Sequence, residues 1–259
     1  VTDNVNQNNN LFIAWCWKGG GSSVQNNDGS IQGANCLVSA NVAAGFSIIK
    51  WRGNATNGAT IGHGLNSAPE LIIHKGLTNP TSWIIGIGGI SGFSASDYLQ
   101  FSSAAKSNSS TFFQGYGSNT FTVGVSSANE MNKNSSNYYI GYAFHSVSGV
   151  QKVGKYTGNG NNAGTIVDTG FTPRFLMIKS SSTNDNGGGA WIMYDNARST
   201  SNPRSKRLFA NFTAGEQDNV NYNLDFLTGS TKGFQPLNGA SGGWGYNTLN
   251  VEYVYLAIA

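Results

Sequence analysis

An internal repeat is the feature of this 259-residue chain that most restricts its fold. The run from Trp51, WRGNATNGATIGHGL, recurs from Tyr156 as YTGNGNNAGTIVDTGF, with a Gly-Asn pair two residues after the aromatic ring in both. Each half closes on a similar segment, because residues 139–144 (YIGYAF) match residues 253–258 (YVYLAI). The offset between matched positions grows along the chain, which indicates insertions in polar loops. Self-similarity on this scale predicts a tandem duplication.

The composition indicates that the repeated unit is all-β. Charged residues make up 10% of the chain and aromatic residues 12%, and there are 35 glycines. The abundant Gly, Asn, Ser, Thr, Ile and Val are turn and strand formers. Short apolar runs bounded by Gly, Asn, Ser or Pro, such as 46–51 and 175–178, predict strands. Several runs are apolar at consecutive positions, which is typical of strands covered on both faces.

We therefore expect an all-β fold of two tandem jelly-roll-like β-sandwich repeats. The first repeat would span residues 19–149 and the second residues 150–259. The segment between them, Val147 to Lys152, has no Pro-rich or Gly/Ser-rich tether, so we expect the two repeats to pack in a fixed arrangement.

A third copy of the closing pattern stands near the start of the chain, at Leu11–Trp17 (LFIAWCW). Residues 1–18 are accordingly interpreted as the closing strand of a preceding repeat. Two hypotheses remain open: the precursor continues N-terminally, or this strand completes one of the two visible sandwiches by strand exchange. The cysteines, Cys16 and Cys36, are too few to identify a compartment, and their disulfide state stays open.

Charge and hydropathy argue against two classes of partner. The net charge is only +3, and the Lys and Arg residues are scattered rather than gathered into a stripe that would neutralise phosphates. No stretch approaches the roughly 20 consecutive apolar residues of a membrane-spanning helix. We expect neither a nucleic acid nor a membrane as partner.

Residues for catalysis are sparse and are not duplicated. No acid pair recurs at matched positions of the two halves, and no Gly-x-Ser-x-Gly elbow is set between a strand and a helix. The histidines lack the close Cys or His neighbours of metal sites; they are His63, His74 and His145. We expect no catalytic residue, no metal and no cofactor. A polysaccharide depolymerase stays a third hypothesis, which requires two carboxylates about 5 to 9.5 Å apart. The candidates for that pair are Glu70, Asp97, Glu130, Asp195 and Asp225.

Aromatic residues among Gly, Asn and Ser are the candidate glycan-binding residues. In exposed loops, flat amphipathic rings can stack on a sugar or anchor a neighbouring subunit. The alternative is that these rings close the loops from inside the core. The candidates are Trp51, Tyr116, Tyr156, Trp244 and Tyr246. Trp83 and Trp191 occupy matched strand positions, and we expect both in the core.

Together, these motifs resemble a family of repeat domains in virion proteins of marine tailed bacteriophages. The resemblance covers nearly the whole chain, although the second copy has Asp168–Phe171 (DTGF) where the pattern has GHGL. It supplies no catalytic residues. The segments that carry it are Trp15–Lys18 (WCWK), Asp28–Ile31 (DGSI), Val38–Asn41 (VSAN), Tyr156–Gly160 (YTGNG) and Gly62–Leu65 (GHGL).

The resemblance implies a noncatalytic structural or surface protein of a bacteriophage virion. The expected partners are copies of the same chain and other virion proteins, and the expected location is the surface of the particle. Fibre, appendage and capsid decoration all remain open. The alternative function is a lectin-like module that binds host-surface glycan through the aromatic candidates.

Overall fold

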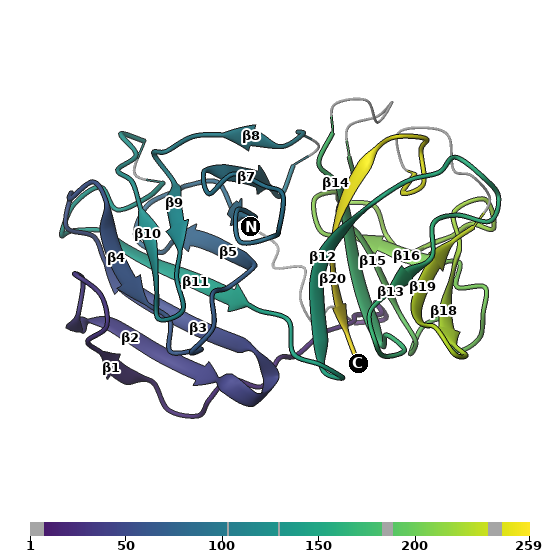
Figure 1. Ribbon diagram of the computed structural model, residues 1–259, viewed down its shortest axis with the longest axis horizontal. Helices are drawn as coiled ribbons and strands as arrows, with labels where there is room; N and C mark the ends of the chain where they lie inside the picture. The colour runs from purple at the N-terminus through teal and green to yellow at the C-terminus, as the bar shows by residue number, and fades with distance from the viewer. Residues whose placement is uncertain (1–7, 103, 129, 183–188, 238–244) are drawn as a thin grey trace.

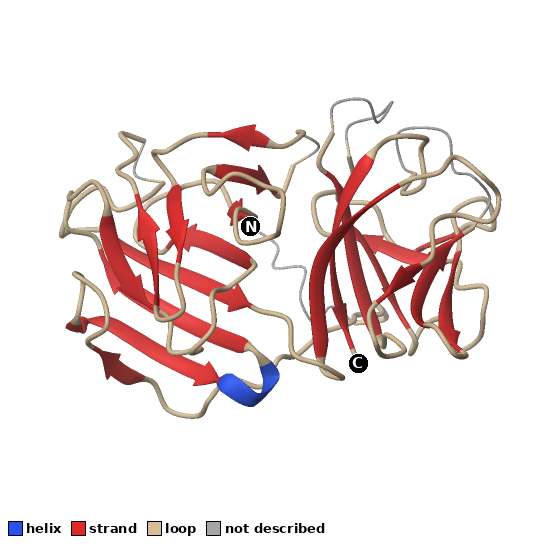
Figure 2. Cartoon of the chain, in the orientation of Figure 1, coloured by secondary structure: helices blue, strands red, loops and turns tan. Residues whose placement is uncertain are grey.

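The computed structural model describes residues 8–102, 104–128, 130–182, 189–237 and 245–259. Its regular structure is almost entirely strand, and within those residues the one helical element is a 3-10 turn, η1 (Val42–Ala44). Two β-sandwiches lie side by side (Figures 1 and 2). The predicted all-β class and the sandwich architecture are thus confirmed.

The first sandwich packs a broad antiparallel sheet against a three-stranded one. The broad sheet has the order β1-β2-β3-β11-β5-β6-β7-β8, and the smaller sheet has the order β4-β10-β9. The strands are β1 (Val24–Asn26), β2 (Gly33–Asn41), β3 (Phe46–Arg52), β4 (Ala59–Gly62), β5 (Leu71–Gly76), β6 (Ile84–Gly86), β7 (Asp97–Gln100), β8 (Ser107–Asn108), β9 (Phe113–Tyr116), β10 (Thr120–Val123) and β11 (Tyr138–Phe144).

The second sandwich repeats this topology without the β1–β2 extension. Its sheets have the orders β12-β20-β14-β15-β16-β17 and β13-β19-β18. The strands are β12 (Gln151–Thr157), β13 (Val167–Asp168), β14 (Phe175–Ser180), β15 (Ile192–Asp195), β16 (Lys206–Phe209), β17 (Gln217–Asp218), β18 (Leu224–Thr228), β19 (Lys232–Pro236) and β20 (Glu252–Ile258). In both sandwiches the closing strand is central: β11 pairs with β3 and β5, and β20 pairs with β12 and β14.

The duplication extends to ring contacts in the two cores. In the first core, the Trp51 ring stacks on Tyr139 at 5.5 Å between centroids. In the second core, Tyr156 stacks on Tyr253 at 5.2 Å. A phenylalanine at the matched position packs edge-to-face on each stack. Phe121 lies 5.7 Å from the Trp51 ring, and Phe234 lies 5.6 Å from the Tyr156 ring. The repeated aromatic residues therefore hold matching positions inside each sandwich.

A buried asparagine in each repeat fixes the Gly-Asn turn that the sequence duplicates. The Asn132 amide donates to Asn54 Oδ1 at 3.0 Å, and the Asn54 N–H donates back to Asn132 Oδ1 at 2.9 Å. Asn247 and Asn159 exchange the same pair of bonds, at 3.0 and 3.1 Å. Both Asn132 and Asn247 are fully buried. Since an unsatisfied buried amide is costly, these bonds secure the loops that cover the open end of each sandwich.

The N-terminal segment differs from the prediction. Leu11–Trp17 forms no strand, because β11 and β20 already occupy the closing position of both sandwiches. Trp15 and Trp17 instead pack edge-to-face on Phe175, each at 5.6 Å. The segment thus enters the contact between the two sandwiches from one end.

Candidate functional site: an apolar groove between the sandwiches

Alternating side chains of the closing strands build two different surfaces. In β11, Tyr139 and Ala143 point into the core of the first sandwich, whereas Tyr142 and Phe144 belong to a third apolar cluster. In β20, Val254 likewise belongs to this third cluster. Because successive residues of a strand point to opposite faces, a strand that is apolar throughout must be covered on both. The broad sheets of the two sandwiches cover each other.

Polar contacts fix this packing at the seam, the short connection between the two sandwiches at residues 147–152. The Gln151 side chain at the start of β12 is buried and donates to the carbonyls of Gly45 and His145, at 2.7 Å each. The Ser146 hydroxyl donates to the Glu70 carboxylate at 2.6 Å and accepts from the Val153 N–H at 3.1 Å. Side chains of both sandwiches therefore hold the short connection in place.

A second set of contacts joins the sandwiches away from the seam. Trp191 Nε1 donates to the carbonyl of Gln100 at 2.7 Å, and the Trp191 ring lies edge-to-face on Phe101 at 5.0 Å. The Lys106 N–H donates to the Ser181 carbonyl at 3.0 Å. With contacts at both places, a hinge motion would break hydrogen bonds as well as apolar contact.

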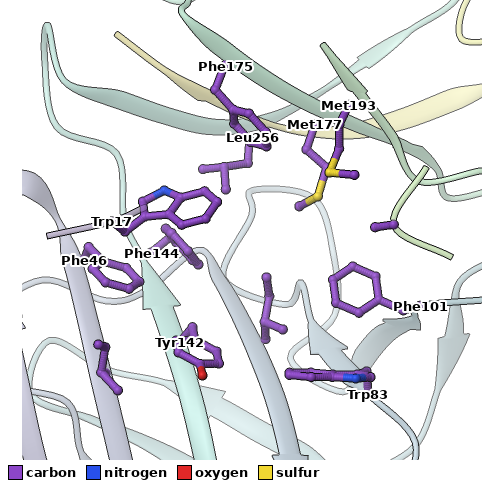
Figure 3. A pocket seen from close by; sticks show the side chains of 13 residues that line it. Trp17, Phe46, Trp83, Phe101, Tyr142, Phe144, Phe175, Met177, Met193 and Leu256 are labelled. Carbon is purple, nitrogen blue, oxygen red and sulfur yellow. The ribbon is translucent and has the colours of Figure 1, made fainter. Parts of the chain in front are cut away.

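The two sheets do not close completely along this contact, and a groove of about 430 Å³ remains (Figure 3). Its size lies in the usual range for ligand sites, roughly 300 to 1,000 Å³. Among the described residues that line it, none is charged, and Tyr142 carries the one phenolic hydroxyl. The lining residues are Trp17, Phe46, Ile48, Ile73, Trp83, Phe101, Tyr142, Phe144, Phe175, Met177, Met193, Ala210 and Leu256.

The structure corrects most of the predicted glycan-binding residues. Trp51, Tyr156 and Tyr246 are buried, so the prediction that they form an exposed binding surface is wrong. Tyr116 is half-buried, and burial raises the pKa of its hydroxyl. Trp244 lies outside the described residues. The polar neighbours that suggested surface loops belong to loops that fold inward over each core, as the asparagine bonds show.

Tyr246 shows how such a ring is held. Its backbone carbonyl accepts from the Tyr156 hydroxyl at 2.6 Å, and its own hydroxyl lies 2.9 Å from that of Tyr194. Burial raises the pKa of Tyr246 well above the ordinary value for tyrosine. These three rings are parts of the second core.

The matched tryptophans Trp83 and Trp191 are unequal. Trp191 is 2% exposed, as expected for a core residue, whereas Trp83 is 36% exposed at the rim of the groove. The sequence could not distinguish them, because Trp191 is covered by Phe101 of the other sandwich, whereas Trp83 meets Phe101 of its own sandwich at the groove. The groove itself was missed for the same reason.

The whole chain, residues 1–259, matches the model of a protein family described as a domain of unknown function, DUF7483. The chain belongs to the DUF7483 family. Neither the curated proteins nor the solved structures contain a significant match to it. The family match therefore fixes the relationship of this DUF7483 chain and carries no activity with it.

Acidic side chains of this DUF7483 chain are engaged in structural bonds. Burial raises the pKa of Asp97, but hydrogen bonds from Asn108, Ser94 and Lys106 outweigh it, so the pKa is below its ordinary value. Asp195 forms an ion pair with Arg198, with 2.6 Å between Oδ2 and Nε. Glu70 accepts hydrogen bonds at the seam, as described above. The carboxylates of Asp97, Asp195 and Glu70 are thus each engaged by a hydrogen bond or an ion pair within the fold.

Asp225 and Glu130 complete the set of acids that the depolymerase hypothesis names. Burial raises the pKa of Asp225, and the nearby Arg204 opposes that rise. Glu130 contributes its backbone carbonyl to the Nε2 of His74, at 2.5 Å. The Glu130 contact is made by its backbone, and it attaches the loop to the buried imidazole of His74.

The histidines and cysteines also have structural surroundings. His74 is buried, lies 5.1 Å from the Trp51 ring, and has its pKa lowered by burial to about 4. Burial likewise lowers the pKa of His63. Cys36 is buried and Cys16 exposed, and both thiols are free. In the described ranges, no group of three or more His, Cys, Asp or Glu side chains could hold a metal ion. Within the same ranges, no helix has the length and apolarity needed to cross a membrane.

Proposed function

We propose that this chain is a noncatalytic structural protein of a bacteriophage virion, exposed on the particle as fibre, appendage or capsid decoration. It assembles with copies of itself and with other virion proteins. The observation that carries the proposal is the apolar contact between the two broad sheets, which makes the tandem repeat one rigid building block. Two sandwiches that are joined in this way keep a fixed relative orientation, which suits a subunit of a fibre or a shell.

Two further features support this function. Of the motifs that resemble phage repeat domains, Trp15–Lys18 lies in the interface segment, and Tyr156–Gly160 spans the end of β12 and the turn that follows it. The formal net charge of +3 is small, so neighbouring copies repel one another little. Burial of Trp51, Tyr156 and Tyr246 removes three of the five aromatic residues on which the lectin alternative rested.

The test is the mass and symmetry of the native material, measured by light scattering and followed by electron microscopy. We expect a regular oligomer, a fibre or a lattice. A monodisperse monomer at every concentration would contradict the proposal. A broad glycan array is the matched test of the lectin alternative, and we expect no binding that depends on these rings.

A further inference from the structure

The N-terminal segment exposes apolar side chains beside the interdomain groove. Leu11 is 102% exposed, Phe12 52% and Ile13 36%. Three consecutive large apolar residues in water are unfavourable, since removing apolar surface of this size from water stabilises a protein. Scattered single residues of this kind are ordinary, but a contiguous group marks an interaction site.

The register of the segment shows which face is unsatisfied. Aligned on the closing strands, Phe12 falls at the position of Tyr139 and Cys16 at that of Ala143. Tyr139 and Ala143 are fully buried in their sandwich core, whereas Phe12 and Cys16 are exposed. The other face is used, because Trp17 packs on Phe144 at 6.3 Å and lines the groove. The segment has the pattern of a strand covered on both sides, and it is covered only partly, at Trp15 and Trp17, whereas its Leu11–Ile13 end is exposed.

The groove is the complementary surface on the same molecule. It is apolar and uncharged, and Figure 3 shows Trp17 at one side of it, opposite Trp83 and Phe101. Phe12 and Trp17 are five positions apart, which spans at most about 18 Å when the chain is extended. Exposed segment and groove are therefore neighbours on the surface.

We propose that Leu11–Trp17 is an assembly strand that docks, through its Leu11–Ile13 end, into the groove of a second copy of this chain. The inference rests on the proposed self-assembly and names its contact. A second copy fits because neighbouring donor and acceptor surfaces can pair reciprocally across a two-fold axis, which buries both pairs at once. Docking of the Leu11–Ile13 end would also extend a contact that is already present, since Trp15 and Trp17 pack between the two sandwiches of their own copy.

The first experiment measures self-association of the full chain by light scattering and sedimentation. We expect Phe12→Asp to weaken association at least tenfold, and Ile73→Asp, in the groove wall, to do the same. Val220→Asp is the matched control, because Val220 is 67% exposed and lies away from the groove lining. It should leave association unchanged. Circular dichroism checks that each variant keeps the native fold.

A cross-link keeps the test valid if Ile73→Asp does not fold. In a Cys16→Ser background, a Phe12→Cys chain mixed with a Trp83→Cys chain should form a disulfide between the two chains under mild oxidation. The second readout uses the unmodified chain: Ellman's reagent should react with Cys16 more slowly in the assembled protein than after dilution. Cys36, which is buried, serves as the internal unreactive thiol.

The outcomes separate this inference from the proposed function. If the native chain assembles, Phe12→Asp assembles equally well and no cross-link forms, the assembly strand is refuted while self-assembly stands. If the native chain is a monomer at all concentrations, both fail. Weakened association in the Phe12→Asp and groove variants alone, together with the cross-link and protection of Cys16, supports the inference.

Discussion

The matched tryptophans give the sharpest test of the contact between the sandwiches. Trp191→Phe deletes the Nε1–H that bonds to Gln100 in the first sandwich. Loss of this bond, with its acceptor left unpaired, costs about 1 to 3 kcal/mol. The smaller ring leaves a cavity that adds about 1 kcal/mol. We therefore expect the free energy of unfolding to fall by roughly 2 to 4 kcal/mol.

Trp83→Phe is the internal control because it makes the same chemical change at the matched position. Trp83 is at the rim of the groove, and its indole nitrogen makes no hydrogen bond to the described residues. We expect a cost below about 1 kcal/mol. Urea unfolding, followed by tryptophan fluorescence and circular dichroism, measures both variants. Equal costs, or a Trp191→Phe effect confined to one of two separate transitions, would refute the reasoning.

Three further predictions follow from groups inside each sandwich. Asn132→Ala and Asn247→Ala should each lower the unfolding free energy by a similar amount, roughly 2 to 4 kcal/mol in urea titrations, because both amides are buried in matching networks; a large inequality would contradict the matched roles. His74 has a folded pKa of about 4 against an ordinary value of 6.5, so its neutral form stabilises the fold above pH 6.5 and that stability is lost as the pH falls toward 4. The loss of stability is of order 3 kcal/mol. Between pH 6.5 and 4, the unfolding free energy of the native chain should therefore fall more steeply than that of His74→Ile; parallel curves would count against this prediction. Ellman's reagent on the dilute folded chain should titrate one thiol rapidly, Cys16, since Cys36 is buried with its pKa raised to about 11; two fast thiols would disagree with the packing.

The sequence was sufficient to predict the strands and the duplication, because both rest on local pattern. Closing strands apolar at consecutive positions, such as Tyr139–Phe144, indicated that two faces are covered. That pattern does not name what covers the second face, and the partner turned out to be the broad sheet of the other sandwich. A long-range contact of this kind leaves no periodic signal.

The aromatic candidates failed for a related physical reason. Trp51 precedes a Gly-Asn turn that reads as a surface loop, and the turn is exposed at its tip. The ring is nevertheless buried, because Asn132, far along the chain, binds the turn and closes the loop over the core. Polarity of neighbours in sequence therefore does not predict exposure of the ring. The duplicated Gly-Asn pair was the one signal that this turn mattered structurally.

The most direct test of the account is the rigidity of the tandem repeat. Spin labels on exposed positions of the two sandwiches, at Val42→Cys and Val220→Cys in a Cys16→Ser background, report the distance between them by electron double resonance. Dilution with unlabelled chain removes signals between copies. Two sandwiches locked through their broad sheets should give one narrow distance distribution. A broad distribution would show that they move independently, and the rigid building block would be refuted.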